Sequence, residues 1–68
     1  MKNHDYEYVR TIVQEGNFSK AAQKLYISQP ALSAAIKKIE KDLNGIPLFD
    51  RSVNPVKLTV EGEYWLEK

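Results

Sequence analysis

The chain has no cysteine and a single histidine among its 68 residues, and these absences exclude many kinds of site. Without cysteine there is neither a disulfide scaffold nor a thiolate metal site. His4 lies near the N-terminus, where solvent exposure is expected rather than a role as general base. The sequence also has no glycine-rich phosphate loop and no cluster of carboxylates. We therefore expect no enzyme activity, no cofactor and no metal ion.

Long apolar segments are missing as well. No apolar run approaches the length that spans a membrane, and residues 1–8, MKNHDYEY, lack the apolar segment of a signal peptide. These absences predict a cytoplasmic protein with no membrane partner. Hydrophobic residues make up 43% of the chain, which is enough for one small core and argues against disorder.

Positive charge is concentrated in the middle of the chain, although the net charge is only +1. Residues 16–41 contain five lysines and one glutamate, a balance of +4, whereas both flanking segments are acidic. A basic segment of this kind suits nucleic-acid binding. A solvated helical face would show the same charge, so the distribution favours nucleic acid without deciding the matter.

The clearest pattern is the stretch from Ser28 to Leu43, SQPALSAAIKKIEKDL. Ser28 can cap a helix, and Pro30 in the first turn costs no helical hydrogen bond. One stripe of the predicted helix is apolar and consists of Leu32, Ile36, Ile39 and Leu43. The opposite side carries small and hydroxyl residues first and lysines later: Pro30, Ser33, Ala34, Lys37 and Lys41. Such a face can approach base edges in a DNA major groove and place lysines on phosphates, but an ordinary surface helix has the same stripe.

The segment before this helix changes that balance. The apolar spacing of Tyr6, Val9, Ile12 and Val13 predicts a helix over residues 4–15 that ends at Gly16. Asn17 is placed to cap a second helix over residues 18–26, with Phe18, Ala21, Ala22 and Leu25 facing inward. Only Tyr26 and Ile27 then precede Ser28, and we expect Tyr26 to pack beside this turn and Ile27 to be buried in it. Two helices joined by so short a turn are typical of a helix-turn-helix.

The segment after it predicts a wing and the start of another helix. Asn44 and Gly45 both tolerate the left-handed backbone that ends a helix. Two short apolar runs, 48–49 and 56–58, are joined by a turn at Asn54–Pro55, which predicts a two-stranded wing with Arg51 and Lys57 near its base. A simple loop over the core would also fit. Thr59 is expected to cap a fourth helix, which reaches residue 68 after only about two turns and is expected to be truncated.

Three segments together resemble the N-terminal DNA-binding domain of LysR-type transcriptional regulators: EGNFSKAAQKLYISQPALSAAIKKIEKDL, PLFDR and LTVEG. The resemblance implies a mainly α, winged helix-turn-helix fold, with a three-helix core, a two-stranded wing and the start of a fourth, linker helix. It divides the chain into a DNA-binding domain, residues 1–58, and the truncated start of a dimerisation helix, residues 59–68. In that family the third helix lies in the major groove and the wing touches the backbone or minor groove.

The same resemblance implies a function and its partners. The chain is expected to be the reading head of a bacterial regulator that binds double-stranded DNA sequence-specifically. The full-length protein is expected to act as a homodimer or higher homo-oligomer on an interrupted inverted repeat. A small-molecule effector would bind a domain that is absent from this chain.

Individual positions are carried over from the family in the same way. Base readout is assigned to the first turns of the third helix, at Gln29, Pro30, Ser33 and Ala34. Gln29 can pair with adenine and Pro30 can pack on a thymine methyl group. Phosphate contacts are assigned to Asn17, Ser19, Ser28, Lys37, Arg51 and Lys57. Tyr64 and Trp65 are assigned to the dimer interface, although each would equally fit a role in this chain's own core.

Three positions depart from the family pattern. Ala34 stands where many members have arginine or another long polar residue, and the wing tip, residues 53–55, has no basic side chain. Asn44 looks like an extra residue before the glycine and would shift the turn into the wing. Together the three departures predict weaker electrostatic affinity and a greater reliance on dimerisation and DNA shape.

The alternative function is a winged-helix module that binds a protein instead of DNA. Such a surface should carry aromatic or large aliphatic anchors on the exposed face of the third helix. The residues there are Ser33, Ala34, Lys37 and Lys41, which favours DNA.

Overall fold

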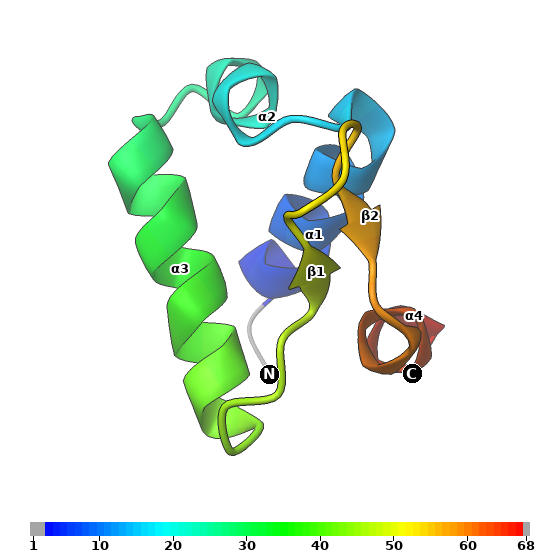
Figure 1. Ribbon diagram of the computed structural model, residues 1–68. Coiled ribbons are helices and arrows are strands. Elements are labelled where there is room, and N and C mark those ends of the chain that lie inside the picture. The colour runs from blue at the N-terminus through cyan, green and yellow to red at the C-terminus, as the bar shows by residue number, and fades with distance from the viewer. Residues whose placement is uncertain (1–2, 68) are drawn as a thin grey trace.

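The computed structural model describes residues 3–67 and contains four helices and one two-stranded sheet (Figure 1). Their order is α1 (Asn3–Glu15), α2 (Phe18–Lys24), α3 (Gln29–Asp42), β1 (Phe49–Asp50), β2 (Lys57–Leu58) and α4 (Val60–Glu67). This confirms the predicted mainly α architecture, and the predicted helix boundaries differ from the observed ones by only one or two residues. No helix within residues 3–67 has the length and apolar character needed to cross a membrane.

The core lies where α1, α2 and α3 meet, and β1 and α4 close it from the other side. Its buried apolar side chains are Val9, Ile12, Ala21, Ala22, Leu32, Ile36, Ile39, Leu48, Phe49 and Trp65. Ala21 and Ala22 are completely or almost completely buried, because their small side chains let the neighbouring helices approach α2 closely. Val13, which was expected on the apolar face of α1, is instead 39% exposed.

Three predicted residues cap the starts of the helices. The Asn17 Oδ1 atom accepts a hydrogen bond from the Lys20 N–H at 2.9 Å, and the Ser28 Oγ atom accepts one from the Ala31 N–H at 3.2 Å. Thr59 Oγ1 accepts from the Gly62 N–H and donates to the Pro47 carbonyl. Each hydroxyl or amide oxygen satisfies an N–H group that has no partner within its helix.

The turn between α2 and α3 corrects the expectation for Tyr26. The Tyr26 N–H bonds to the Gln23 carbonyl and the Ile27 N–H bonds to the Ala22 carbonyl, which is the Schellman ending of a helix. This ending requires a left-handed residue, and Tyr26 has a φ of +59°. Its side chain is 94% exposed, so it does not pack beside the turn. Ile27 is half-buried against the core, so its predicted burial in the turn is confirmed in part.

The end of α3 uses the same geometry. Asn44, with a φ of +62°, takes the left-handed position, and the Gly45 N–H bonds to the Glu40 carbonyl at 2.8 Å. Glu40 also accepts a hydrogen bond from the Leu48 N–H through its carboxylate, at 2.9 Å. The last turn of α3 therefore holds the chain that leads into β1.

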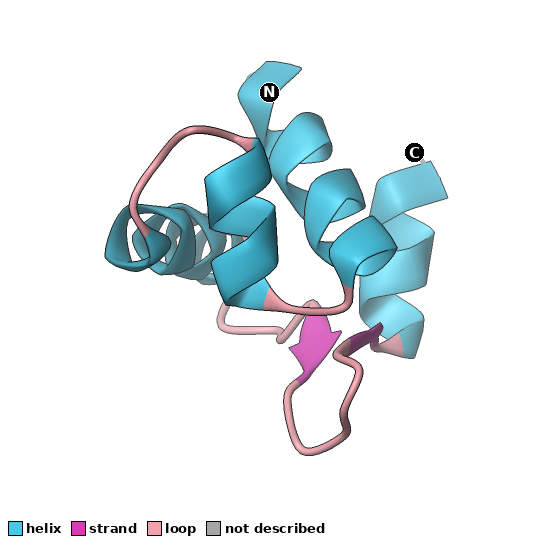
Figure 2. Cartoon of the chain, turned by 90° about the horizontal axis from the view of Figure 1, so that it is seen from above, coloured by secondary structure: helices cyan, strands magenta, loops and turns pink. Residues whose placement is uncertain are grey.

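The strands pair antiparallel, with Phe49 opposite Leu58 and Asp50 opposite Lys57. The loop between them projects beyond the helices (Figure 2) and turns at a cis Asn54–Pro55 bond. It returns beside the turn between α1 and α2, where the Val56 N–H donates to the Gly16 carbonyl at 3.0 Å. This hydrogen bond fixes the wing to the start of α2.

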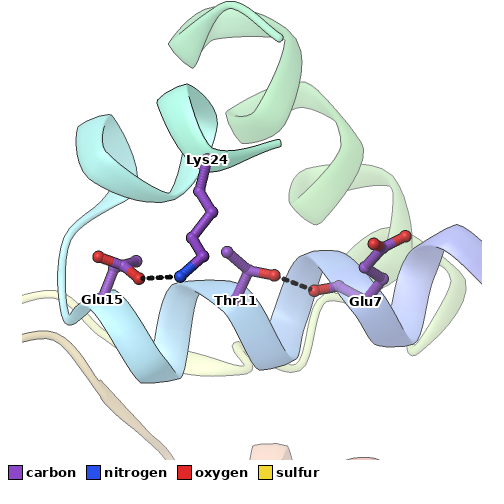
Figure 3. Close-up of polar contacts among 4 residues, drawn as sticks. All are labelled: Glu7, Thr11, Glu15 and Lys24. Carbon is purple, nitrogen blue, oxygen red and sulfur yellow. Dashed lines mark hydrogen bonds and ion pairs between the residues drawn. The ribbon is translucent and has the colours of Figure 1, made fainter. Parts of the chain in front are cut away.

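Polar contacts along α1 are local, and one ion pair joins α1 to α2 (Figure 3). The Thr11 hydroxyl donates to the Glu7 carbonyl at 2.7 Å, which satisfies the hydroxyl of a buried side chain. Lys24 on α2 reaches Glu15 on α1, with 3.5 Å between Nζ and Oε2. Within residues 3–67 this is the only ion pair.

Candidate nucleic-acid interface

Helix α3 packs on the core through Leu32, Ile36 and Ile39. The face of α3 that lies opposite these three residues is therefore turned to solvent. In Figure 1 it lies along one edge of the molecule. The four residues assigned to base readout lie on its first two turns, where Gln29, Pro30 and Ala34 are exposed and Ser33 is half-buried. A short, polar and accessible surface of this kind fits a major groove.

Two of these residues contact each other. The Gln29 side-chain amide donates to the Ser33 hydroxyl, with 3.3 Å between Nε2 and Oγ. Residues four apart on a helix are neighbours on one face, so this contact needs no distortion of α3. It orients the Gln29 amide along the exposed face of α3.

A concavity of about 290 Å³ joins the start of α3 to the start of α2 and the wing. Five of the predicted DNA-contacting residues line it: Asn17, Ser19, Gln29, Ser33 and Arg51. Residues from three separate segments of the chain therefore meet at one place. The other predicted residues, Ser28, Pro30, Ala34, Lys37 and Lys57, lie outside its lining.

Two of the side chains assigned to phosphate contacts already have a role in the fold. Asn17 Oδ1 and Ser28 Oγ each cap a helix, so their acceptor capacity is partly used by backbone N–H groups. Ser19, the residue after Phe18, is exposed in the first turn of α2. It is therefore the more accessible hydroxyl at this end of α2.

Arg51 is held at the concavity by an aromatic ring. Its guanidinium carbon lies 4.5 Å from the centroid of the Phe18 ring, and Phe18 in turn makes an edge-to-face contact with Phe49 at 5.6 Å. The sequence pattern predicts only that Phe18 lies on the inward face of α2. The spacing of residues in the sequence gives no signal for this contact, because the wing brings Arg51 to Phe18 only in the folded chain.

The wing also carries a negative charge. The Ser52 hydroxyl and the Ser52 N–H both donate hydrogen bonds to the Asp50 carboxylate. These bonds, the one from the hydroxyl more than the one from the N–H, hold the pKa of Asp50 below its ordinary value. An aspartate is ionised at neutral pH even at its ordinary pKa, so Asp50 is negatively charged there, and it lies opposite Lys57 in the sheet. This carboxylate reduces the positive charge at the base of the wing.

The basic side chains assigned to phosphate contacts are free of carboxylates. Among residues 3–67 only Lys24 and Glu15 form an ion pair, so Lys37, Arg51 and Lys57 have no acidic partner within 4 Å in this part of the chain. Lys37, Arg51 and Lys57 are all exposed. An unpaired exposed cation is available to a phosphate without first breaking an ion pair.

The two residues assigned to the dimer interface lie differently. Tyr64 is 63% exposed, whereas Trp65 is 8% exposed and stacks on Tyr6 of α1 with 4.8 Å between ring centroids. Both residues also line an apolar groove of about 420 Å³, together with Leu43, Ile46, Val60 and Glu61. Trp65 therefore serves the core of this chain and still borders an exposed apolar surface.

Within residues 3–67, no three acidic or histidine side chains form a group that would hold a metal ion.

Residues 4–63 match the family model described as "Bacterial regulatory helix-turn-helix protein, lysR family". The chain belongs to the LysR family. This confirms the resemblance found in its motifs. Over 58 residues, this LysR-family chain is 53% identical to a "Probable RuBisCO transcriptional regulator" of Cyanidioschyzon merolae. The matched region is 85% of this chain and 19% of that relative.

Two solved structures of high similarity are DNA complexes. The LysR-family chain matches the BenM_DBD/catB site 1 DNA complex with a TM-score of 0.88 and 42% identity, over 98% of this chain and 71% of that one. It matches the CbnR_DBD–DNA complex with a TM-score of 0.84 and 33% identity, over 98% of this chain and 76% of that one. The chain spans about a fifth of the length of the curated relatives that it matches.

Proposed function

We propose that this chain binds double-stranded DNA sequence-specifically, as the DNA-binding domain of a bacterial transcriptional regulator. The observation that carries the proposal is the meeting of Gln29, Ser33 and Arg51 at one exposed concavity between α3, α2 and the wing. In this proposal α3 enters the major groove, and the wing touches the backbone or the adjacent minor groove. The similarity to the BenM and CbnR complexes with DNA supports it.

Base readout falls to the first two turns of α3. Gln29 offers an amide that can pair with adenine, and Ser33 offers a hydroxyl that bonds to either donors or acceptors. Pro30 and Ala34 present small apolar surfaces to thymine methyl groups. The Ala34 side chain has no hydrogen-bonding group, so Gln29 and Ser33 supply the polar part of the specificity.

Phosphate contacts fix the register of the chain on the duplex. Lys37 and Arg51 supply the charged contacts, and Lys57 supplies a further one. Asn17, Ser19 and Ser28 supply polar contacts through side chains or N–H groups at the starts of α2 and α3. The modest net charge of +1 predicts weaker non-specific affinity than a strongly basic reading head would have.

The full-length regulator works as a homodimer or higher homo-oligomer on an interrupted inverted repeat. Residues 1–58 form the DNA-binding domain, and residues 59–68 begin the dimerisation helix, where exposed Tyr64 and the rim of Trp65 contact the second copy. Two-fold symmetry would place the two α3 helices in major grooves one helical turn or more apart. A small-molecule effector would act through a domain outside these residues, and the regulator would work in the cytoplasm, on bacterial DNA, without catalysing a reaction.

A protein-interaction module remains the contrasting function. It would need large apolar anchors on the exposed face of α3. The exposed residues on that face are instead small, polar or basic. The most exposed large apolar side chains lie off this face, at Tyr26 in the turn before α3 and at Val60 and Tyr64 on α4. The face of α3 therefore favours DNA.

The test is a titration of the chain with a mixed-sequence DNA duplex over a series of salt concentrations. The logarithm of the binding constant should fall linearly with the logarithm of the salt concentration, by about 0.9 for each phosphate that is neutralised. Lys37→Gln should reduce this slope by about one contact. Lys24→Gln is the matched control, because Lys24 is already paired with Glu15. Binding that is absent or insensitive to salt would favour the protein-interaction function.

A further inference from the structure

The contact between Arg51 and Phe18 has a specific consequence for DNA binding. An exposed arginine normally samples many rotamers, and ordering it on a ligand costs side-chain entropy. Arg51 is exposed and has no carboxylate partner within residues 3–67. The Phe18 ring, 4.5 Å from the guanidinium carbon, is therefore the contact that restricts the end of this side chain.

The Phe18 ring is itself fixed from two sides. Its backbone follows the Asn17 cap at the start of α2, and its edge-to-face contact with Phe49 ties it to β1. Phe49 is almost completely buried. The ring is therefore anchored both by α2 and by a buried side chain of β1.

The backbone of Arg51 is restricted as well. Arg51 follows β1 directly, and the Asp50 carboxylate accepts hydrogen bonds from both the N–H and the hydroxyl of Ser52. This turn places Arg51 between two residues that bond to each other. Both ends of the arginine side chain are thus held before any ligand binds.

A guanidinium that stacks on a ring keeps its N–H donors free, because all of them lie in the plane of the group. Arg51 and Phe18 line the same concavity as Ser19 and Ser33. We propose that Phe18 is a positioning residue for DNA binding, and that its ring holds the Arg51 guanidinium with its donor edge ready for one backbone phosphate. This inference rests on the proposed function and adds to it a residue that does not itself touch DNA.

A double-mutant cycle on the 68-residue chain separates this role from simple packing. The four proteins are the unaltered chain, Phe18→Leu, Arg51→Gln and the double variant, each titrated with a mixed-sequence duplex between about 50 and 200 mM salt. Phe18→Leu should weaken binding about three- to tenfold when Arg51 is present and less than about twofold when residue 51 is glutamine. It should also lower the salt dependence only when Arg51 is present.

Three further variants keep the test independent of stability. Phe18→Tyr retains the ring and should restore most of the affinity. Tyr6→Leu is a matched control, because it removes a stacked core aromatic that contacts Trp65 instead of Arg51, and its effect on binding should not depend on residue 51. If Phe18→Leu does not fold, Phe18→Met replaces it, since methionine fills irregular core gaps.

Proton NMR of the free protein gives a readout without DNA. The side-chain protons of Arg51 should be displaced upfield by the Phe18 ring and should return to ordinary values in Phe18→Leu. Equal losses of affinity in both backgrounds, or undisplaced Arg51 protons in the unaltered chain, would overturn the inference alone. Failure of the unaltered chain to bind DNA in a salt-dependent way would overturn the proposed function and this inference together.

Discussion

Gln29 donates a hydrogen bond to Ser33 on the exposed start of α3, with 3.3 Å between the amide nitrogen and the hydroxyl oxygen. The contact links the two polar side chains among the residues that we propose to read bases. Ser33 also borders the concavity that Arg51 reaches from the wing. The side chains that we propose to read bases therefore lie next to the arginine that we propose to contact a phosphate. Substitutions should distinguish these two roles.

Gln29→Ala and Lys37→Ala should change DNA binding in different ways. Gln29→Ala should cost about 1–3 kcal/mol on the preferred sequence and relax the preference at one base pair. Lys37→Ala should weaken all sequences about equally and reduce the salt dependence by about one phosphate. Titrations against the preferred site and its single-base variants measure both effects. If neither substitution changed binding, the placement of α3 in the major groove would be wrong.

Tyr26→Gly should stabilise the fold. Tyr26 has a φ of +59°, which costs a residue with a Cβ atom about 1–2 kcal/mol, and its side chain makes little contact because it is 94% exposed. Glycine removes the strain and loses some of the gain to its greater freedom in the unfolded chain, so we expect a net gain of about 0.5–1 kcal/mol. Urea unfolding measures it. Tyr26→Ala keeps the Cβ atom and should give no comparable gain; equal gains from both variants would show that strain is not the cause.

Gly16→Ala should destabilise the chain more than Gly45→Ala. Both glycines have a positive φ, so both substitutions carry the same kind of backbone cost. A Cβ atom at Gly16 would also lie 2.6 Å from the Pro55 Cβ atom, whereas the space around Gly45 is open. We expect an additional loss of about 1–3 kcal/mol at Gly16 and faster hydrogen exchange at the Val56 amide, whose acceptor is the Gly16 carbonyl. Equal losses at the two glycines would mean that the wing does not press on this turn.

Ser52→Ala should raise the pKa of Asp50 toward its ordinary value, because the Ser52 hydroxyl is the larger cause of the lowered pKa. A lowered pKa in the folded state stabilises the fold above the ordinary pKa of aspartate, and this contribution is lost as the pH falls through the lowered value. Asp50 should therefore not titrate near neutral pH in either protein. Carbon NMR of the Asp50 carboxyl group across the acidic range follows the change. An unchanged pKa in Ser52→Ala would show that the hydroxyl does not bond to the carboxylate in solution.

The local parts of the fold were predictable from the sequence. Asn17, Ser28 and Thr59 cap helices through contacts with the residue three positions later, so neighbouring residues alone determine them. Tyr26 was predicted wrongly because its aromatic side chain suggested burial, whereas the Schellman ending of α2 sets its backbone and turns the side chain outward.

The site was only partly predictable, for a different reason. The face of α3 follows from helical spacing, but the stacking of Arg51 on Phe18 depends on how the wing packs against α2. The burial of Trp65 against Tyr6 depends in the same way on the packing of α4 against α1. Contacts between distant segments carry no signal in local spacing. The base, phosphate and dimer roles of the named residues remain predictions.

The most direct test of the DNA-reading account is selection of bound sequences from a random duplex pool with the purified chain, followed by a salt titration of the selected DNA. The account predicts enrichment of one sequence motif, as an inverted repeat if the chain dimerises or as single half-sites if it does not. Binding to the motif should weaken steeply with salt, by about 0.9 in the logarithmic slope for each phosphate contact. A pool that shows no enrichment, with binding that is absent or insensitive to salt, would contradict the account.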